Sequence, residues 1–152
     1  MTIRSEKDLR RALRSLAAAS AGRLAPLVFI EPARGGSIGA PDAFLGVSGC
    51  GFAALELKIV ARASSEAAGG HLAAPGGRGS GGRAKAIGGL ARLAYALLRP
   101  SQKAFFRAAR AGGAPAFLLF AVRGGTAVFI DDGTKCTEIR HAEDLFRVLS
   151  GG

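Results

Sequence analysis

Residues 41–58 constrain the fold of this chain most, because two apolar segments flank the glycine-containing turn 48–51. This pattern is typical of a β-hairpin. The charged residues of the hairpin are Asp42, Glu56 and Lys58. A charge inside an apolar strand is costly unless it is paired or binds a metal ion. The hairpin therefore carries a prediction about chemistry as well as one about structure.

The register of the hairpin decides whether its two acids meet. If a three-residue loop joins the strands, Val47 pairs with Gly51 and Asp42 lies opposite Glu56. A two-residue loop instead places Asp42 opposite Leu57 and separates the acids. Three-residue loops with a glycine in the left-handed conformation are common, so we expect the first register. Directly paired residues lie on one face of the sheet, about 5 Å apart.

Two facing carboxylates repel each other, so a positive charge should lie between them. Lys58 shares the face of Glu56 and could partly supply that charge. A hard divalent cation suits the site better, because carboxylates together with retained water are the ligands of magnesium. The alternative is a solvated strand face with a surface aspartate and a Glu–Lys pair.

The length and charge of the chain limit the classes of function. Its 152 residues predict one domain, and its net charge of +10 predicts a polyanionic partner, with DNA first and an anionic membrane surface second. Residues 61–112 hold 9 Lys/Arg against 1 Asp/Glu, and so carry +8 of that charge. No apolar signal region begins the sequence and no apolar run is long enough to span a bilayer, so we expect a cytoplasmic protein, nucleoid- or phage-associated. With two Cys and two His, no zinc spacing is present.

An amphipathic helix is predicted over residues 3–19, with an apolar stripe at helical spacing and a separate basic stripe. The basic stripe consists of Arg4, Lys7, Arg11 and Arg14. Glu6 lies on the apolar side, where it could reach a metal site. The simpler alternative is a boundary residue that pairs with Arg10.

Residues 27–30 predict a first strand, and residues 31–40 a flexible loop that leads into the hairpin. The glycines of this loop allow the backbone to approach a ligand closely. Arg34 and Ser37 could contact a phosphate there, or be ordinary loop residues.

A Gly-rich basic insertion is predicted at about residues 61–98. Between residues 69 and 89, 9 of 21 residues are glycine, which is typical of a linker or mobile loop. Arg78, Arg83 and Lys85 make this part cationic, as in a segment that follows a nucleic-acid backbone. A tolerated low-complexity insertion is the alternative. A helix over residues 87–98 ends the segment.

The remaining elements are a helix from a Ser101 cap to about residue 111, strands at 115–122 and 126–130, and a helix at 142–149. On the first of these helices Gln102 lies on the buried face and needs polar partners, which an acidic metal site would supply. A local capping role is the alternative. The opposite, basic face carries Lys103, Arg107 and Arg110. The order of elements predicts an α/β fold, a mixed sheet flanked by helices.

These residues together resemble the PD-(D/E)XK nuclease superfamily. Pro41-Asp42 and Glu56-Leu57-Lys58 match its motif, and Ser101-Gln102 resembles the start of the corresponding helix in the VRR-NUC branch. The loop with Arg34 and Ser37 resembles that of archaeal Holliday-junction resolvases. The resemblance implies a single nuclease domain over residues 1–152, with a restriction-endonuclease-like α-β-β-β-α-β core.

The resemblance also implies a function, the hydrolysis of DNA phosphodiester bonds with Mg²⁺ or Mn²⁺. The metal would be held by Asp42, Glu56 and the Leu57 carbonyl, with Glu6 at a bound water or at a second metal. Lys58 would stabilise developing charge, and Gln102 would orient Lys58 or the attacking water.

Three questions about function stay open at this point. The chain could instead be a nucleic-acid-binding protein with a vestigial nuclease site, or a basic membrane-surface protein. The motifs do not distinguish branched or junction DNA from other substrates. Cleavage of a junction would require a homodimer, for which residues 87–98 or 126–130 are candidate interfaces.

Overall fold

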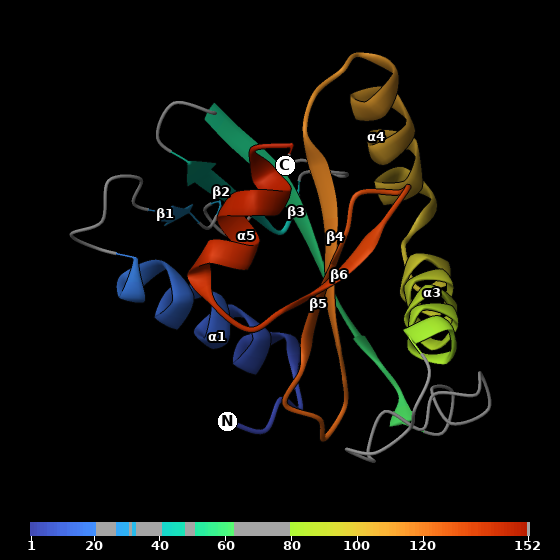
Figure 1. Cartoon of the computed structure of the whole chain (residues 1–152). Helices are drawn as coiled ribbons and strands as arrows, with labels where there is room; N and C mark the ends of the chain where they lie inside the picture. The colour runs from blue at the N-terminus through green and yellow to red at the C-terminus, as the bar shows by residue number, and fades with distance from the viewer. Residues whose placement is uncertain (21–26, 31, 33–40, 48–50, 63–79, 152) are drawn as a thin grey trace.

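The structure is a computed structural model that describes residues 1–20, 27–30, 32, 41–47, 51–62 and 80–151. Figure 1 shows a sheet of six strands with helices on both faces. The elements in chain order are α1 (Glu6–Ala19), β1 (Leu27–Ile30), β2 (Ala43–Val47), β3 (Gly51–Val60), α3 (Ser80–Ala96), α4 (Pro100–Ala111), β4 (Ala116–Val122), β5 (Val128–Asp131), β6 (Cys136–Ile139) and α5 (Ala142–Leu149). The protein is therefore an α/β fold, with four helices flanking a six-stranded mixed sheet.

The strands lie side by side in the order in which they occur in the sequence, β1 to β6. All neighbouring pairs are antiparallel except β3 and β4, which are parallel, with Glu56 beside Leu118 and Lys58 beside Phe120. A parallel pair needs a long crossover connection, and α3 and α4 lie within that connection. The two longest strands thus form the centre of the sheet, as the apolar segment 115–122 predicts for β4.

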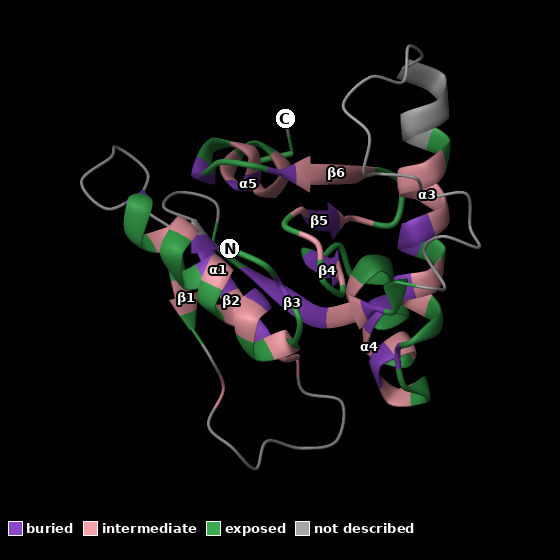
Figure 2. Ribbon diagram, turned by 90° about the horizontal axis from the view of Figure 1, so that it is seen from below, coloured by how far each residue is buried: buried purple, intermediate pink, exposed green. Residues whose placement is uncertain are grey.

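Two hydrophobic cores lie on opposite faces of the sheet. Odd-numbered β3 residues such as Leu55 and Leu57 pack with Leu9 and Leu13 of α1 and with Leu145 of α5. Even-numbered neighbours belong to the second core, which α3 and α4 cover. Figure 2 shows the buried residues concentrated along the sheet between these two helical layers. Because β3 is covered on both faces, any polar side chain in its middle is removed from water.

Two helices begin elsewhere than their sequence patterns predict. Helix α1 begins at Glu6 and not at residue 3, because Ser5 and Asp8 form a capping box that sets the N-terminus of the helix at this point. Ile3 instead forms a bridge with Gly125. Helix α4 is preceded by Arg99 as its N-cap residue and has Pro100 at its first position, so the expected Ser101 cap is wrong.

The second half of the chain also departs from expectation. Residues 80–86 are helical and belong to α3, although the helix was expected to begin only at residue 87, and buried Leu90 and Ala94 anchor this helix on the sheet. Strand β6 was not predicted, because its sequence Cys-Thr-Glu-Ile lacks a strong apolar pattern. Strand β5 pairs on both sides, with β4 and β6, so the stretch 126–130 provides no free edge for a dimer. Within the described part of the chain, no helix combines the length and the apolar character needed to span a membrane.

Candidate active site

The β2–β3 hairpin brings the two acids together in the register that the three-residue loop predicts. Val47 pairs with Gly51, whose φ of 83° is left-handed, and Ala43 pairs with Leu55. One step further along the ladder, Asp42 lies beside Glu56, and its Oδ2 accepts a hydrogen bond of 2.9 Å from the Leu57 N–H. The side chain of Asp42 thus continues the hydrogen-bond ladder to β3 just before β2 begins.

Glu56 is the most deeply placed acid of the site. Its side chain is 0% exposed and points to the face of β3 that α4 covers. The Gln102 Nε2 donates a hydrogen bond of 2.5 Å to Glu56 Oε2. The other oxygen, Oε1, has no hydrogen-bond partner among the described residues. A buried, unpartnered carboxylate oxygen is costly, and binding of a cation is one way to offset that cost.

Gln102 combines the two roles that the sequence left open. Its Oε1 accepts a hydrogen bond of 3.0 Å from the backbone N–H of Arg99, so the side chain caps the first turn of α4. Its amide nitrogen reaches across to Glu56 at the same time. Gln102 therefore fixes the start of α4 to the middle of β3.

Burial raises the pKa of Glu56 to about 8, and the neighbouring carboxyl of Asp42 and the charge of Glu6 raise it further. The positive charge of Lys58 acts in the opposite direction. Without a cation, the Glu56 carboxyl therefore carries a proton at neutral pH. A divalent ion between the two acids would replace that proton.

Lys58 lies between two acids on different elements. Its Nζ is 3.9 Å from Asp42 Oδ2 and 3.9 Å from Glu6 Oε1, and its side chain is largely buried. Strand β2 begins at Ala43 opposite Leu55, so the second half of β3 extends beyond the β2 ladder. The first turn of α1 reaches Lys58 at this uncovered edge.

Arg10 contacts the site in a way that the sequence argument missed. Its Nη1 donates a hydrogen bond of 3.2 Å to the Asp42 carbonyl oxygen, and its Nη2 lies 3.7 Å from Asp42 Oδ1. The signal that could have found it is the spacing from Glu6, because residues i and i+4 share one face of a helix. One face of α1 thus supplies both an acidic residue, Glu6, and a cationic residue, Arg10, to the site.

The donor atoms that the site could offer to a cation are all oxygens. They are the carboxylates of Asp42 and Glu56 and the carbonyl of Leu57, which points to the same edge as its own N–H, towards Asp42. Such an all-oxygen set with retained water suits Mg²⁺ or Mn²⁺. The described residues contain no group of three or more His, Cys, Asp and Glu that could hold a metal. Glu6, the expected additional ligand, instead contacts Lys58.

The predicted DNA-binding residues do not all gather at this site. The side chain of Lys103 packs over the Tyr95 ring, and Arg110 packs over Phe106 and against Gly133, next to Asp131 and Asp132. Arg107 is exposed on α4 and Lys85 on α3, and Arg83 also lies in α3. The positions of Arg34, Ser37 and Arg78 lie outside the described residues.

Comparisons of this chain with protein-family models, with curated proteins and with solved structures find no match. The chemistry of the site is therefore inferred from its own geometry.

Proposed function

We propose that this protein is a divalent-metal-dependent endonuclease that hydrolyses phosphodiester bonds of DNA, with a site of the PD-(D/E)XK type. The observation that carries the proposal is the buried Glu56 carboxyl, which lies beside Asp42 and has one oxygen without a partner among the described residues. The order of α1, β1, β2, β3, the α3–α4 pair and β4 also agrees with the α-β-β-β-α-β core of that superfamily.

Each residue of the site has a distinct role in this proposal. Asp42, Glu56 and the Leu57 carbonyl would hold Mg²⁺ or Mn²⁺. When bound, the metal would polarise the scissile phosphate and make a water molecule more acidic. The ammonium of Lys58 stabilises the negative charge that develops on the phosphate in the transition state.

The surrounding residues keep these groups in position. Arg10 contacts the carbonyl oxygen and Oδ1 of Asp42, and Gln102 holds Glu56 through Oε2, which leaves Glu56 Oε1 for the cation. Glu6 and Asp42 each lie 3.9 Å from the Lys58 Nζ and restrain it. Such pre-positioning lets the site act on a phosphate without reorganising first.

A second candidate function is binding of nucleic acid without cleavage. One observation favours it, since the described residues bring no third carboxylate to the metal site. Against it, Asp42, Glu56 and Lys58 are all present, with Lys58 Nζ 3.9 Å from Asp42 Oδ2 and Glu56 buried beside Asp42. The two functions differ in whether any DNA form is cut in Mn²⁺.

The test is incubation with plasmid DNA and with synthetic branched and linear DNA in Mg²⁺, Mn²⁺ or EDTA. Loss of a group that only orients a metal ligand lowers activity about 10–100-fold, so Asp42→Asn, which removes a ligand, should lower the cleavage rate by at least about 100-fold. Glu143→Gln on α5 is the matched control and should cut like the wild type. Equal cleavage by wild type and Asp42→Asn would show that the site is wrong. Binding with no cleavage in any metal would favour the second function.

A further inference from the structure

A cavity of about 620 Å³ continues from the candidate active site along the second half of β3. Lys58 and Glu6 belong to both. The cavity lies at the carboxyl ends of the parallel strands β3 and β4, where ligands of open α/β sheets commonly bind. It is lined by the start of α1, the end of β3, the α3–α4 junction and the β4–β5 turn, with the residues Arg4, Ser5, Glu6, Lys7, Lys58, Ile59, Leu97, Arg99 and Arg123.

Positive charge dominates this cavity. Five of its lining residues are Lys or Arg and one is acidic, and that acid, Glu6, is paired with Lys58. The other acid of this turn, Asp8, accepts hydrogen bonds from the backbone of the α1 cap. The remaining four cations, Arg4, Lys7, Arg99 and Arg123, form no ion pair within the described part of the chain.

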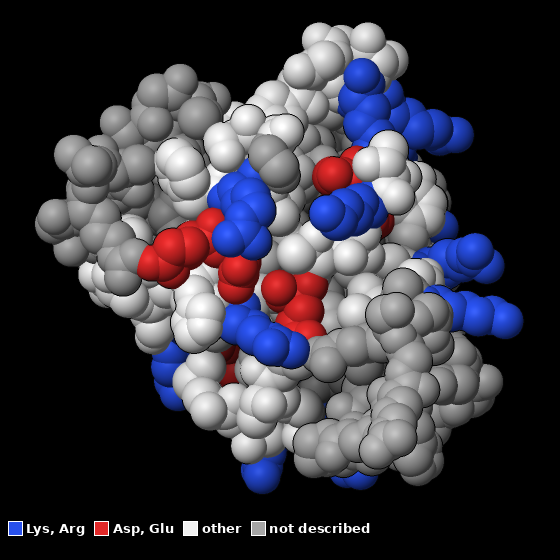
Figure 3. All heavy atoms as spheres, in the orientation of Figure 1, with Lys and Arg blue, Asp and Glu red and all other residues white. Residues whose placement is uncertain are grey.

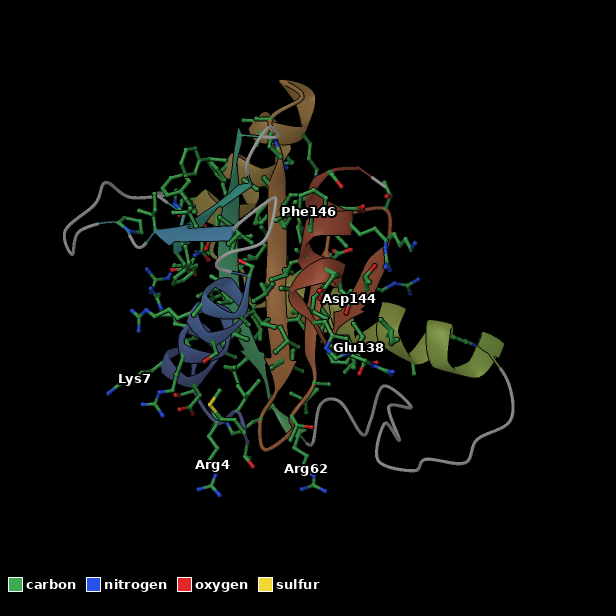
Figure 4. All side chains as sticks on the ribbon, turned by 60° about the vertical axis from the view of Figure 1, so that its left-hand side comes forward. Arg4, Lys7, Arg62, Glu138, Asp144 and Phe146 are labelled. Carbon is green, nitrogen blue, oxygen red and sulfur yellow. The ribbon has the colours of Figure 1, made fainter. Side chains whose placement is uncertain are left out.

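Cations from three separate parts of the chain, the start of α1, the α3–α4 junction and the β4–β5 turn, therefore line one cavity without a compensating acid. Figure 4 shows Arg4 and Lys7 extending outward from the N-terminal end of α1. Like charges brought together in this way repel each other, and a polyanion that binds between them relieves the repulsion. A chain of phosphates, one of them at the candidate active site, fits this distribution.

Besides Ser5, the uncharged lining is aliphatic, with no aromatic side chain. Leu97 is 51% exposed, which is unusual for a large aliphatic side chain, and Ile59 is partly buried beside it. Aromatic side chains are what most proteins use to stack bases of a single strand. Here the aliphatic wall can contact sugars and the faces of unpaired bases without reading their identity.

The cavity is an open groove, and its volume of about 620 Å³ lies within the range of about 300–1,000 Å³ that accommodates small organic ligands. A short stretch of one strand can therefore lie in it. An unpaired strand can turn its bases towards the aliphatic wall, whereas the bases of a duplex are already paired and stacked.

We propose that this cavity binds an unpaired strand of nucleic acid through its phosphates, next to the phosphate that is cut. The inference rests on the proposed nuclease function and makes it more specific: the substrate has a single-stranded segment beside the cleavage position. Recognition is independent of base sequence, since the contacts are to phosphates and to apolar surfaces of any base.

The experiment is fluorescence anisotropy with labelled oligothymidine and with a duplex of equal length, in EDTA so that neither is cut. The cavity variant is Arg4→Gln/Arg99→Gln/Arg123→Gln. Each phosphate contact to a single strand contributes about 0.7 to the slope of log K against log salt. Removing three contacts should therefore lower the slope for oligothymidine by about 2, and lower the affinity at low salt, while duplex binding changes much less.

The matched control is Arg92→Gln/Lys135→Gln/Arg147→Gln, which removes the same charge from exposed positions outside the cavity. It should keep the wild-type slope. An equal loss in both variants would overturn the proposal, because total charge alone would then explain binding. Wild type that binds the duplex as tightly as oligothymidine through the same three arginines would also overturn it.

Failure of this inference and failure of the nuclease proposal are distinguishable. If the cavity variant binds oligothymidine like the wild type but the wild type cuts DNA in Mn²⁺, the inference is wrong and the function stands. If binding depends on the cavity as described but no DNA is cut, the nuclease proposal is wrong and the strand-binding site stands.

Discussion

At the scale of single residues, Glu56 carries the largest energetic conflict in the described part of the molecule. Its carboxyl is buried on a central strand, hydrogen-bonded to Gln102 through one oxygen and next to the carboxyl of Asp42. The fold tolerates this group either by protonation or by binding a cation. Both possibilities have consequences for stability that can be measured without any assay of cleavage.

The first consequence concerns pH in the absence of metal. The pKa of Glu56 is raised from 4.5 to about 8, so the native protein retains a proton that the unfolded chain has lost. Stability from this residue is therefore full below about pH 4.5, falls as the pH rises towards about 8, and stays low above it. Glu56→Gln lacks this titration and should gain stability relative to the wild type between pH 5 and pH 9.

We expect the gain to be a few kcal/mol at most, since one pKa unit corresponds to about 1.4 kcal/mol. Urea unfolding in EDTA at several pH values measures it. Glu143→Gln, the control on α5, should follow the wild-type pH profile. If Glu56→Gln also parallels the wild type from pH 5 to pH 9, Glu56 is not the buried acid that this structure shows.

The second consequence concerns metal binding. At pH 8, Mg²⁺ or Mn²⁺ should raise the melting temperature of the wild type, because the ion binds only the folded site. At 100 times the Kd the gain is about 2.7 kcal/mol. Asp42→Asn and Glu56→Gln should show little or none of this shift, whereas Glu143→Gln should show all of it. A shift of equal size in all four proteins would mean that the metal binds elsewhere.

At the scale of elements, Gln102 is the buried polar side chain that holds α4 to the middle of the sheet. Gln102 caps the helix and binds Glu56, while Phe106 one turn later is buried in the core. Gln102→Leu keeps much of the volume but leaves the Arg99 N–H and a second Glu56 oxygen without a protein partner. We expect a loss of about 1–3 kcal/mol in the free energy of unfolding.

The neighbouring Ser101 supplies the control for this prediction. Its sequence context suggests an N-cap, yet the cap position belongs to Arg99 and the capping side chain is Gln102. Ser101→Ala should therefore change stability by less than about 0.5 kcal/mol. If Ser101→Ala lowered the free energy of unfolding more than Gln102→Leu, the capping residue would be Ser101, as the sequence suggested.

The elements also show which parts of the structure local pattern could predict. The hairpin register followed from one loop length and a glycine at position 51, so the meeting of Asp42 with Glu56 was predictable. The buried face of α4 followed from its apolar spacing. Strand β6 and residues 80–86 of α3 were not predictable, because neither stretch has a strong apolar pattern. Arg10 was missed because its partner, the Asp42 carboxyl and carbonyl, comes from an element 32 residues away.

At the scale of the whole molecule, the site results from the way layers meet. Helix α1 covers one face of the sheet and α4 the other, and the two contribute Glu6 and Gln102 to one site because β2 begins late and leaves an edge of β3 uncovered. The basic cavity is likewise assembled from four elements. A sequence reading can assign charges to helix faces, but the junction of Arg4, Arg99 and Arg123 exists only in three dimensions.

Charge is also unevenly distributed over the surface. The face shown in Figure 3 mixes acidic and basic side chains. In the C-terminal part of the chain, Arg140 pairs with Glu138 at 3.2 Å and Arg147 with Asp144 at 3.6 Å. The unpaired cations of the cavity lie at the carboxyl ends of β3 and β4 instead. The net charge of +10 is thus not distributed evenly over the protein surface.

This excess predicts how salt affects folding. In water two like charges 10 Å apart repel by about 0.4 kcal/mol, and the Debye length falls to about 10 Å at 0.1 M salt. Screening by salt should weaken the charge repulsion more in the compact native state than in the expanded unfolded chain. Raising NaCl from 25 to 300 mM should therefore increase the melting temperature in EDTA, by about 2–4 °C for each kcal/mol gained. The cavity variant, with three cations fewer, should have a higher melting temperature at 25 mM NaCl and a weaker response to salt than the control triple variant, since its three arginines lie close together. Equal responses of the two triple variants would show that the cations of the cavity do not repel one another in the folded protein.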